Sequence, residues 1–132
     1  MSSVINAGDI VSFVCRDGSF GMAKVLKIDT SEALPVPQAV YHLLVYSYRN
    51  LFPPTAAHAA EAKPFIGHLP VMQSGIDQSD GVVITSAKVS GAELEGYDVW
   101  REAFFAGEAG IFELPIDEAI AIVLEALGKS SP

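Results

Sequence analysis

Three histidines and one cysteine are the side chains of this chain best suited to catalysis or metal binding. His42, His58 and His68 fall in three different predicted elements, so none forms the i, i+4 pair with which a helix presents two metal ligands. The spacing therefore predicts no metal site, and no motif indicates a bound cofactor. His42 stands on an otherwise apolar and aromatic face, which is typical of a hydrogen-bonded histidine in a core or at its rim.

Cys15 is the only candidate thiol nucleophile. It shares one face of a predicted strand with Val11 and Phe13, where a small apolar side chain suits the core. No histidine is close in sequence to activate it. We predict a core cysteine, and a single cysteine excludes an internal disulfide.

Paired carboxylates are the remaining catalytic candidates. Asp117–Glu118 and the pair Glu93 and Glu95 lie in segments predicted to be exposed, where solvent keeps carboxyl pKa values near their ordinary range. Because a nucleophile, a base and an orienting group are not apparent together, the sequence predicts a protein that is not an enzyme. A cleft that brings His42, His68 and a carboxylate within hydrogen-bond reach would favour the enzyme alternative.

A group of aromatic residues is better suited to recognition. Tyr46 and Tyr48 precede Arg49 at the end of the third predicted strand, and Tyr41 and Phe52 are nearby. Tyr and Arg are enriched at protein interfaces because each joins a large contact area to a polar group. Aromatic pockets on small barrels also bind peptides. The same residues fit a core whose hydroxyls reach the surface, and the sequence leaves both alternatives open.

Charge is distributed unevenly along the chain, whose formal net charge is −8. Residues 1–92 hold seven acids and six bases, whereas residues 93–132 hold nine acids and two bases. Nucleic-acid binding needs clustered Lys and Arg, so this composition predicts none. The acidic segment would attract a basic protein, unless it serves only as a solvated face. Its candidate binding residues are Glu93, Glu95, Asp98 and Glu102.

Alternating apolar residues predict strands, which Gly, Pro and polar clusters separate. The first two strands form a hairpin, because Asp17 and Gly18 tolerate the positive φ of a tight turn. Pro70 places its strand at a sheet edge, since proline cannot donate in a central ladder. Residues 73–81 are predicted to be a loop. The predicted strands are 10–15, 20–29, 39–48, 64–72 and 82–89, with a sixth candidate at 111–114.

Helical spacing is clearest in the last quarter of the chain. Predicted helices span about 116–127 between Pro115 and Gly128, and 99–106 with Asp98 as its cap. The Ala-rich stretch 55–63 fits either a short helix capped by Thr55 or an ordered loop. The pattern predicts one α+β domain over 1–132, with a β-rich part at 8–90 and a helical, acidic part at 93–129. The sheet is expected to be a small curved antiparallel sheet or an SH3-like barrel of five to six strands, packed by a C-terminal helix.

No stretch of the sequence has the roughly 20 continuous apolar residues of a membrane span. Residues 1–6 also lack the basic start and apolar core of a signal peptide. We therefore expect a cytoplasmic protein that makes no contact with membranes.

The first quarter of the chain resembles a known family. Residues 8–13 are Gly-Asp-Ile-Val-Ser-Phe, and residues 17–26 are Asp-Gly-Ser-Phe-Gly-Met-Ala-Lys-Val-Leu. This order of a Gly-Asp strand, an Asp-Gly turn and a Val-Leu strand is similar to the opening of the SH3-like immunity proteins of bacterial polymorphic-toxin systems, the immunity protein 26 family. The resemblance covers residues 8–28. The chain departs from that family at residues 14–16, where an apolar-Pro-Leu ending is usual, and at Met22, where an aromatic is common.

The resemblance implies a cytoplasmic protein that blocks a cognate toxin, often a basic nuclease, with carboxylates in the place of phosphates. The leading hypothesis is a non-enzymatic protein-binding domain, specifically a toxin-neutralising immunity protein, that binds through the acidic segment 93–118 and the edge formed by Tyr46, Tyr48 and Arg49. The alternative is a Tudor- or SH3-like module that binds a peptide or small ligand through its aromatic residues. The third hypothesis is an enzyme with an unrecognised site.

Overall fold

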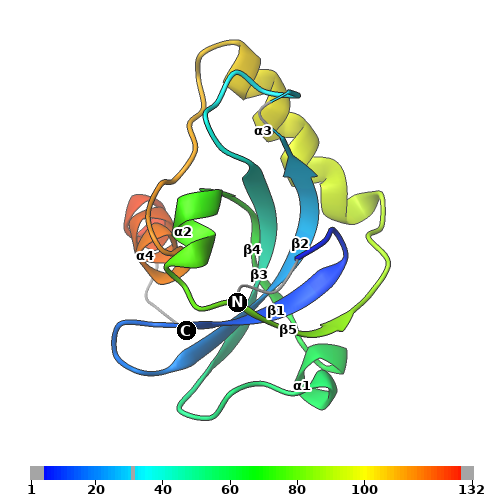
Figure 1. The fold of residues 1–132 in the computed structure, drawn as a ribbon, viewed down its shortest axis with the longest axis vertical. Helices are drawn as coiled ribbons and strands as arrows, with labels where there is room; N and C mark the ends of the chain where they lie inside the picture. Colours follow the sequence, from blue (N-terminus) through cyan, green and yellow to red (C-terminus); the bar gives the residue numbers. More distant parts are fainter. Residues whose placement is uncertain (1–4, 31, 129–132) are drawn as a thin grey trace.

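An antiparallel sheet forms the centre of the molecule. The structure is a computed structural model that describes residues 5–30 and 32–128, and within these residues the sheet has five strands in the order β4-β3-β2-β1-β5 (Figure 1). The strands are β1 (Asp9–Val14), β2 (Phe20–Asp29), β3 (Val40–Asn50), β4 (Pro64–Met72) and β5 (Val82–Ser86). This confirms the α+β class, and β4 is an edge strand as Pro70 predicted. Residues 1–4 of the predicted lead-in and residue 129, the last of the predicted helical part, lie outside the described residues.

The helices of the described residues connect and cover the strands. They are α1 (Ala56–Ala60), α2 (Gln73–Asp77), α3 (Glu95–Phe105), which follows the 3₁₀ turn η1 (Ala92–Leu94), and α4 (Ile116–Leu127). Gly128 ends α4 with a φ of 69°, the left-handed conformation that a glycine adopts without strain. None of these helices combines the length and the apolar character that a membrane crossing needs.

The β1–β2 hairpin forms as predicted. Asp17 accepts hydrogen bonds from both the backbone N–H and the hydroxyl of Ser19, and Gly18 has a φ of 86°. Val14 then pairs with Phe20 and opens the antiparallel register of the two strands.

Both faces of the sheet are covered. On one face, odd-numbered residues of β1 and β3 join α2 and α4 in the main core, which includes Cys15. On the other face, Ile10, Met22, Leu26 and Leu44 form a second cluster. This explains why both faces of β3 are apolar: β3 lies between β4 and β2 and contacts a layer on each side.

Three local predictions were wrong. Residues 73–77 form α2 instead of a loop, because tertiary packing buries Gly75 and Ile76 and holds a helix too short to be stable alone. Residues 111–114 contribute a single parallel bridge between Phe112 and Val71 in place of a sixth strand. Asp98 lies within the first turn of α3 and does not cap it.

The helical backbone begins at η1, before the predicted start at residue 99, because Ser90 and Glu93 form a capping box. The Ser90 N–H donates to the Glu93 carboxylate at 2.8 Å, and the Glu93 N–H donates to the Ser90 hydroxyl at 3.2 Å. This reciprocal pair satisfies two of the N–H groups that a helix start leaves without partners. It fixes the turn that leads directly into α3.

Candidate functional site

Beneath α3, four side chains from four elements form a continuous hydrogen-bonded row, here called the polar chain. Asp29 ends β2, His42 lies in β3, His68 lies in β4, and Tyr97 reaches down from α3. Strand alternation explains the meeting of the first three, because His42 points to the side of the sheet opposite Tyr41 and Leu43, toward α3.

The polar chain has short, well-defined contacts. His42 Nε2 lies 3.0 Å from Asp29 Oδ2, and His42 Nδ1 lies 2.8 Å from His68 Nε2. The Tyr97 hydroxyl donates to the same Asp29 oxygen at 2.8 Å. A carboxylate and two imidazoles are therefore within hydrogen-bond reach, which is the arrangement that would favour the enzyme alternative.

The Asp29 carboxylate determines where the protons of the polar chain lie. An ionised carboxylate only accepts, so His42 Nε2 carries a proton and donates it. In a neutral ring His42 Nδ1 then has a lone pair, and His68 Nε2–H must donate to it. His68 Nδ1 is left with a lone pair, no hydrogen-bond partner among the described residues, and access to solvent.

Burial keeps both imidazoles neutral. It lowers the pKa of His42 to about 4, although the Asp29 carboxylate acts in the opposite direction. Burial and the neighbouring His42 lower the pKa of His68 to about 3. Burial and the Asp29 carboxylate raise the pKa of Tyr97 to about 12, so its hydroxyl remains a donor. A base with a pKa near 3 takes a proton poorly at neutral pH, whereas its lone pair still accepts a hydrogen bond.

Aromatic rings from α3 cover the polar chain. Tyr97 and Trp100 meet the His42 ring edge-on, with centroids 4.6 and 4.8 Å away. The indole N–H of Trp100 donates to the Gly110 carbonyl at 2.9 Å. Every buried side-chain nitrogen or oxygen that the structure describes has a hydrogen-bond partner. The polar chain is therefore a satisfied network that holds α3 on the sheet.

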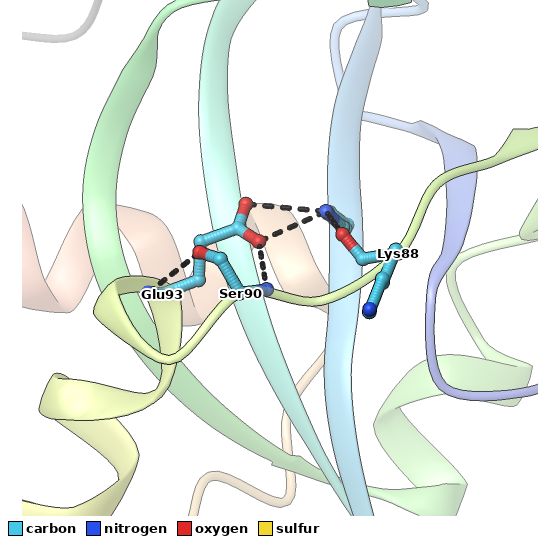
Figure 2. A network of polar contacts seen from close by, with 4 residues as sticks. Lys88, Ser90 and Glu93 are labelled. Carbon is cyan, nitrogen blue, oxygen red and sulfur yellow. Dashed lines mark hydrogen bonds and ion pairs between the residues drawn. The ribbon is translucent and has the colours of Figure 1, made fainter.

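A second polar contact holds the start of α3. Lys24 is almost fully buried, and its ammonium lies 3.0 and 3.2 Å from the two Glu93 carboxylate oxygens and 2.9 Å from the Lys88 carbonyl. Figure 2 shows this network together with the capping contacts of Ser90. Burial acts to raise the pKa of Glu93, but hydrogen bonds from Ser90 and Lys24 and the charge of Lys24 bring it below its ordinary value. Glu93, a predicted binding residue, is thus engaged inside the molecule.

The other predicted acids lie together on the outside of α3. Glu95, Asp98 and Glu102 are exposed and follow a spacing of three and four residues, which puts them on one helix face. The same face carries Val99, 71% exposed, and Phe105, 55% exposed. We call these five residues the acidic face. None of its three carboxylates forms an ion pair with another described residue.

The residues of the predicted aromatic edge, Tyr46, Tyr48 and Arg49, make contacts within the protein. Tyr46 is buried in the second cluster. The Tyr48 hydroxyl donates to the Phe52 carbonyl at 2.6 Å, and Arg49 Nε donates to the Ser19 hydroxyl at 2.6 Å. Tyr48 and Arg49 lie toward the hairpin end of β3, whereas Tyr97 and Trp100 of α3 pack with Val40 at its other end. Leu94, just before α3, packs on the cluster that contains Tyr46. Buried Tyr46 therefore lies near the start of α3, while the Tyr48 hydroxyl and Arg49 are engaged by other residues of the protein.

Sequence reasoning missed Lys24, Asp29 and Tyr97. Two signals were present: Tyr97 and Trp100 stand three residues apart in a helical segment, and Lys24 and Asp29 interrupt an apolar strand. Cys15 is buried in the main core as predicted, and burial raises the pKa of its thiol. The described residues contain no group of three or more metal-ligating side chains placed to hold an ion.

Comparison with protein-family models, with curated proteins and with solved structures gives no match to this chain. Any functional conclusion therefore depends on the sequence and the geometry of the chain itself.

Proposed function

We propose that this protein is a non-enzymatic protein-binding domain whose acidic face on α3 binds a basic protein. The observation that carries this proposal is the row of three exposed carboxylates without ion pairs beside two exposed apolar side chains. An interface needs apolar area at its centre and complementary charge around it, and the acidic face supplies both.

Parts of the acidic face oppose the stability of α3, although Glu95 and Asp98 in its first turn interact favourably with the helix dipole. Like charges three or four residues apart on a helix repel each other by roughly 0.2–0.5 kcal/mol per pair. Glu102 also lies in the C-terminal half of α3, away from the positive end of the helix dipole. A basic partner would relieve both effects, since its Lys and Arg side chains would supply the missing counter-charges.

The more specific form of this proposal is a cytoplasmic immunity protein that neutralises a basic toxin. It is supported by the resemblance of residues 8–28 to the immunity protein 26 family and by the acidic face, which suits a nuclease that normally binds phosphates. The polypeptide carboxylates would then occupy the positions of substrate phosphates.

Affinity capture from the native host tests the proposal. Tagged wild-type protein is expected to retain a basic protein, identified by mass spectrometry, at low salt and to lose it at high salt. The double variant Asp98→Lys/Glu102→Lys should fail to retain it. Glu125→Lys, which reverses an exposed acid on α4, is the matched control and should bind like the wild type. Retention of no basic protein, or equal retention by all three, would contradict the proposal.

A second candidate function is general acid–base catalysis by the polar chain. Its support is the row of Asp29, His42 and His68 at hydrogen-bond distances. Against it stands the pKa of His68 near 3, far below that of an efficient base at neutral pH. Turnover of simple ester or phosphoester substrates that disappears in His68→Gln would favour this candidate. The peptide-binding module has weaker support, because Tyr46 is buried and Tyr48 and Arg49 bond internally.

A further inference from the structure

A cleft of about 370 Å³ opens beside the start of α3, and His68 lines it. Its walls include Leu44, Pro64 and Ala92, and its lining is largely apolar. Glycine is required at one point of the border: a Cβ on Gly96 would come within 2.9 Å of the His68 Cβ. The close approach of α3 to β4 therefore places His68 among the residues that line an apolar cleft.

His68 brings a hydrogen-bond acceptor to this cleft. Its Nε2–H is committed to His42, and the proton order set by Asp29 leaves the lone pair on Nδ1. That atom is accessible and has no partner among the described residues. An acceptor fixed by two further side chains suits a ligand with an N–H donor.

The charge of the cleft selects among such donors. Two carboxylates, Glu93 and Glu95, line it. Lys24 neutralises Glu93, so Glu95 is the only uncompensated charge among the described residues that line the cleft. A ligand with an apolar stem and a positive, donating head matches these features.

We propose that the cleft binds an alkylammonium group, whose N–H donates to His68 Nδ1, whose charge faces Glu95, and whose stem contacts Leu44, Pro64 and Ala92. The group belongs either to a free amine or to a lysine side chain of another protein. Binding at the cleft does not require the acidic face to have a protein partner, so it goes beyond the proposed function.

The test is a titration of the ¹⁵N-labelled full chain with n-butylammonium chloride at pH 7, followed by NMR. We expect saturable shifts of the His68 ring nitrogens and of amides along the cleft. n-Butanol, which has a similar stem and no charge, should shift them far less at equal concentration. Shifts that remain linear, or that butanol reproduces, would overturn the proposal.

Two variants locate the binding. Glu95→Gln should weaken butylammonium binding about two- to fivefold, the usual effect of losing one exposed charge contact. Gly67→Leu should abolish it, because a Cβ at Gly67 meets nothing within 4 Å and the leucine would occupy cleft space without a clash. Asp98→Asn is the matched control, since this acid lies outside the cleft lining. If Asp98→Asn weakens binding as much as Glu95→Gln, the signal is general charge attraction and the proposal falls.

A second ligand distinguishes the two sources of the ammonium group. Nα-acetyl-lysine N-methylamide that binds more tightly than butylammonium would assign the cleft to a lysine side chain, and the reverse order would assign it to a free amine. The outcome is independent of the capture experiment, which reverses Asp98 and Glu102 outside the cleft. Amine binding without a captured protein would contradict only the proposed protein-binding function. A captured protein without amine binding would contradict only the proposed amine site in the cleft.

Discussion

The inner and outer faces of α3 differ in how their polar groups are paired. On the inner face, Tyr97 completes a polar chain in which the buried groups are hydrogen-bonded. On the outer face, Glu95, Asp98 and Glu102 form no ion pair with other described residues. Buried polar groups are costly when a partner is lost, whereas exposed charges contribute little to stability. The inner face therefore holds the helix, and the outer face can change its chemistry at almost no cost to the fold.

The largest expected loss of stability follows Asp29→Ala. This change leaves two buried donors, His42 Nε2–H and the Tyr97 hydroxyl, without their acceptor. At roughly 1–3 kcal/mol per orphaned group, the free energy of unfolding should fall by about 2–6 kcal/mol. Urea denaturation measures it. The outer-face control Asp98→Ala should stay within about 0.5 kcal/mol of wild type. Equal stability of the two variants would show that the inner face does not depend on the polar chain.

Mild acid should destabilise the protein through His42 and His68 of the polar chain. The histidine pKa values of about 4 and about 3 lie below the ordinary 6.5 expected in the unfolded chain. As pH falls from 6.5 toward 4, the unfolded state therefore binds protons that the folded state does not, and stability decreases. The slope should approach about 1.4 kcal/mol per pH unit for each such proton.

Denaturation at several pH values, with NMR titration of the two rings, checks this dependence. The range between pH 6.5 and 5 is the most informative, because the ordinary carboxyl pKa of 4.5 for Glu93 lies below it and its stabilisation is lost only at lower pH. Constant stability across that range, or rings that titrate near 6.5, would show that His42 and His68 are not held neutral by burial.

An intermediate loss of stability is expected when one of two glutamates that lie two residues apart is neutralised. Glu93→Gln removes the counter-charge of buried Lys24, whereas Glu95→Gln changes an exposed group. We expect a loss of about 1–3 kcal/mol for the first, below that of a fully buried pair because Glu93 remains partly exposed, and a change within about 0.5 kcal/mol for the second. Thermal or urea unfolding of both variants measures the difference. A Glu93→Gln protein as stable as Glu95→Gln would place Lys24 in contact with water.

The difference between the faces also explains what the sequence could predict. Regular patterns identified the five strands, the edge position of β4 and the C-terminal helix, because alternation and helical spacing are local properties of the chain. Gln73–Asp77 escaped prediction because α2 depends on burial of Gly75 and Ile76 and not on helix propensity. The spacing of exposed acids on α3 was similarly visible, even though the start of the helix was predicted four residues late.

The polar chain could not be predicted from local pattern. His42 and Tyr97 are 55 positions apart, and their contact depends on how α3 crosses the sheet. The capping box at Ser90 and Glu93 was visible in the sequence, but the role of Glu93 as the partner of Lys24 depends on a contact across 69 positions. Sequence reasoning therefore grouped Glu93 with the exposed acids, whereas tertiary structure places it with the inner face.

The smallest change in stability is expected for neutralisation of the outer face. Asp98→Asn/Glu102→Gln removes two charges that repel each other one turn apart, but also removes the first-turn charge of Asp98 that favours the helix dipole. The two effects oppose each other, so the free energy of unfolding should stay within about 0.5 kcal/mol of the wild type. Retention of the proposed basic partner should nevertheless weaken, because the proposed interface loses two of its three carboxylates. Urea denaturation and salt-dependent capture of the same variant measure both quantities. A clear loss of stability would show that these acids serve the fold, and unchanged capture would show that the partner binds elsewhere.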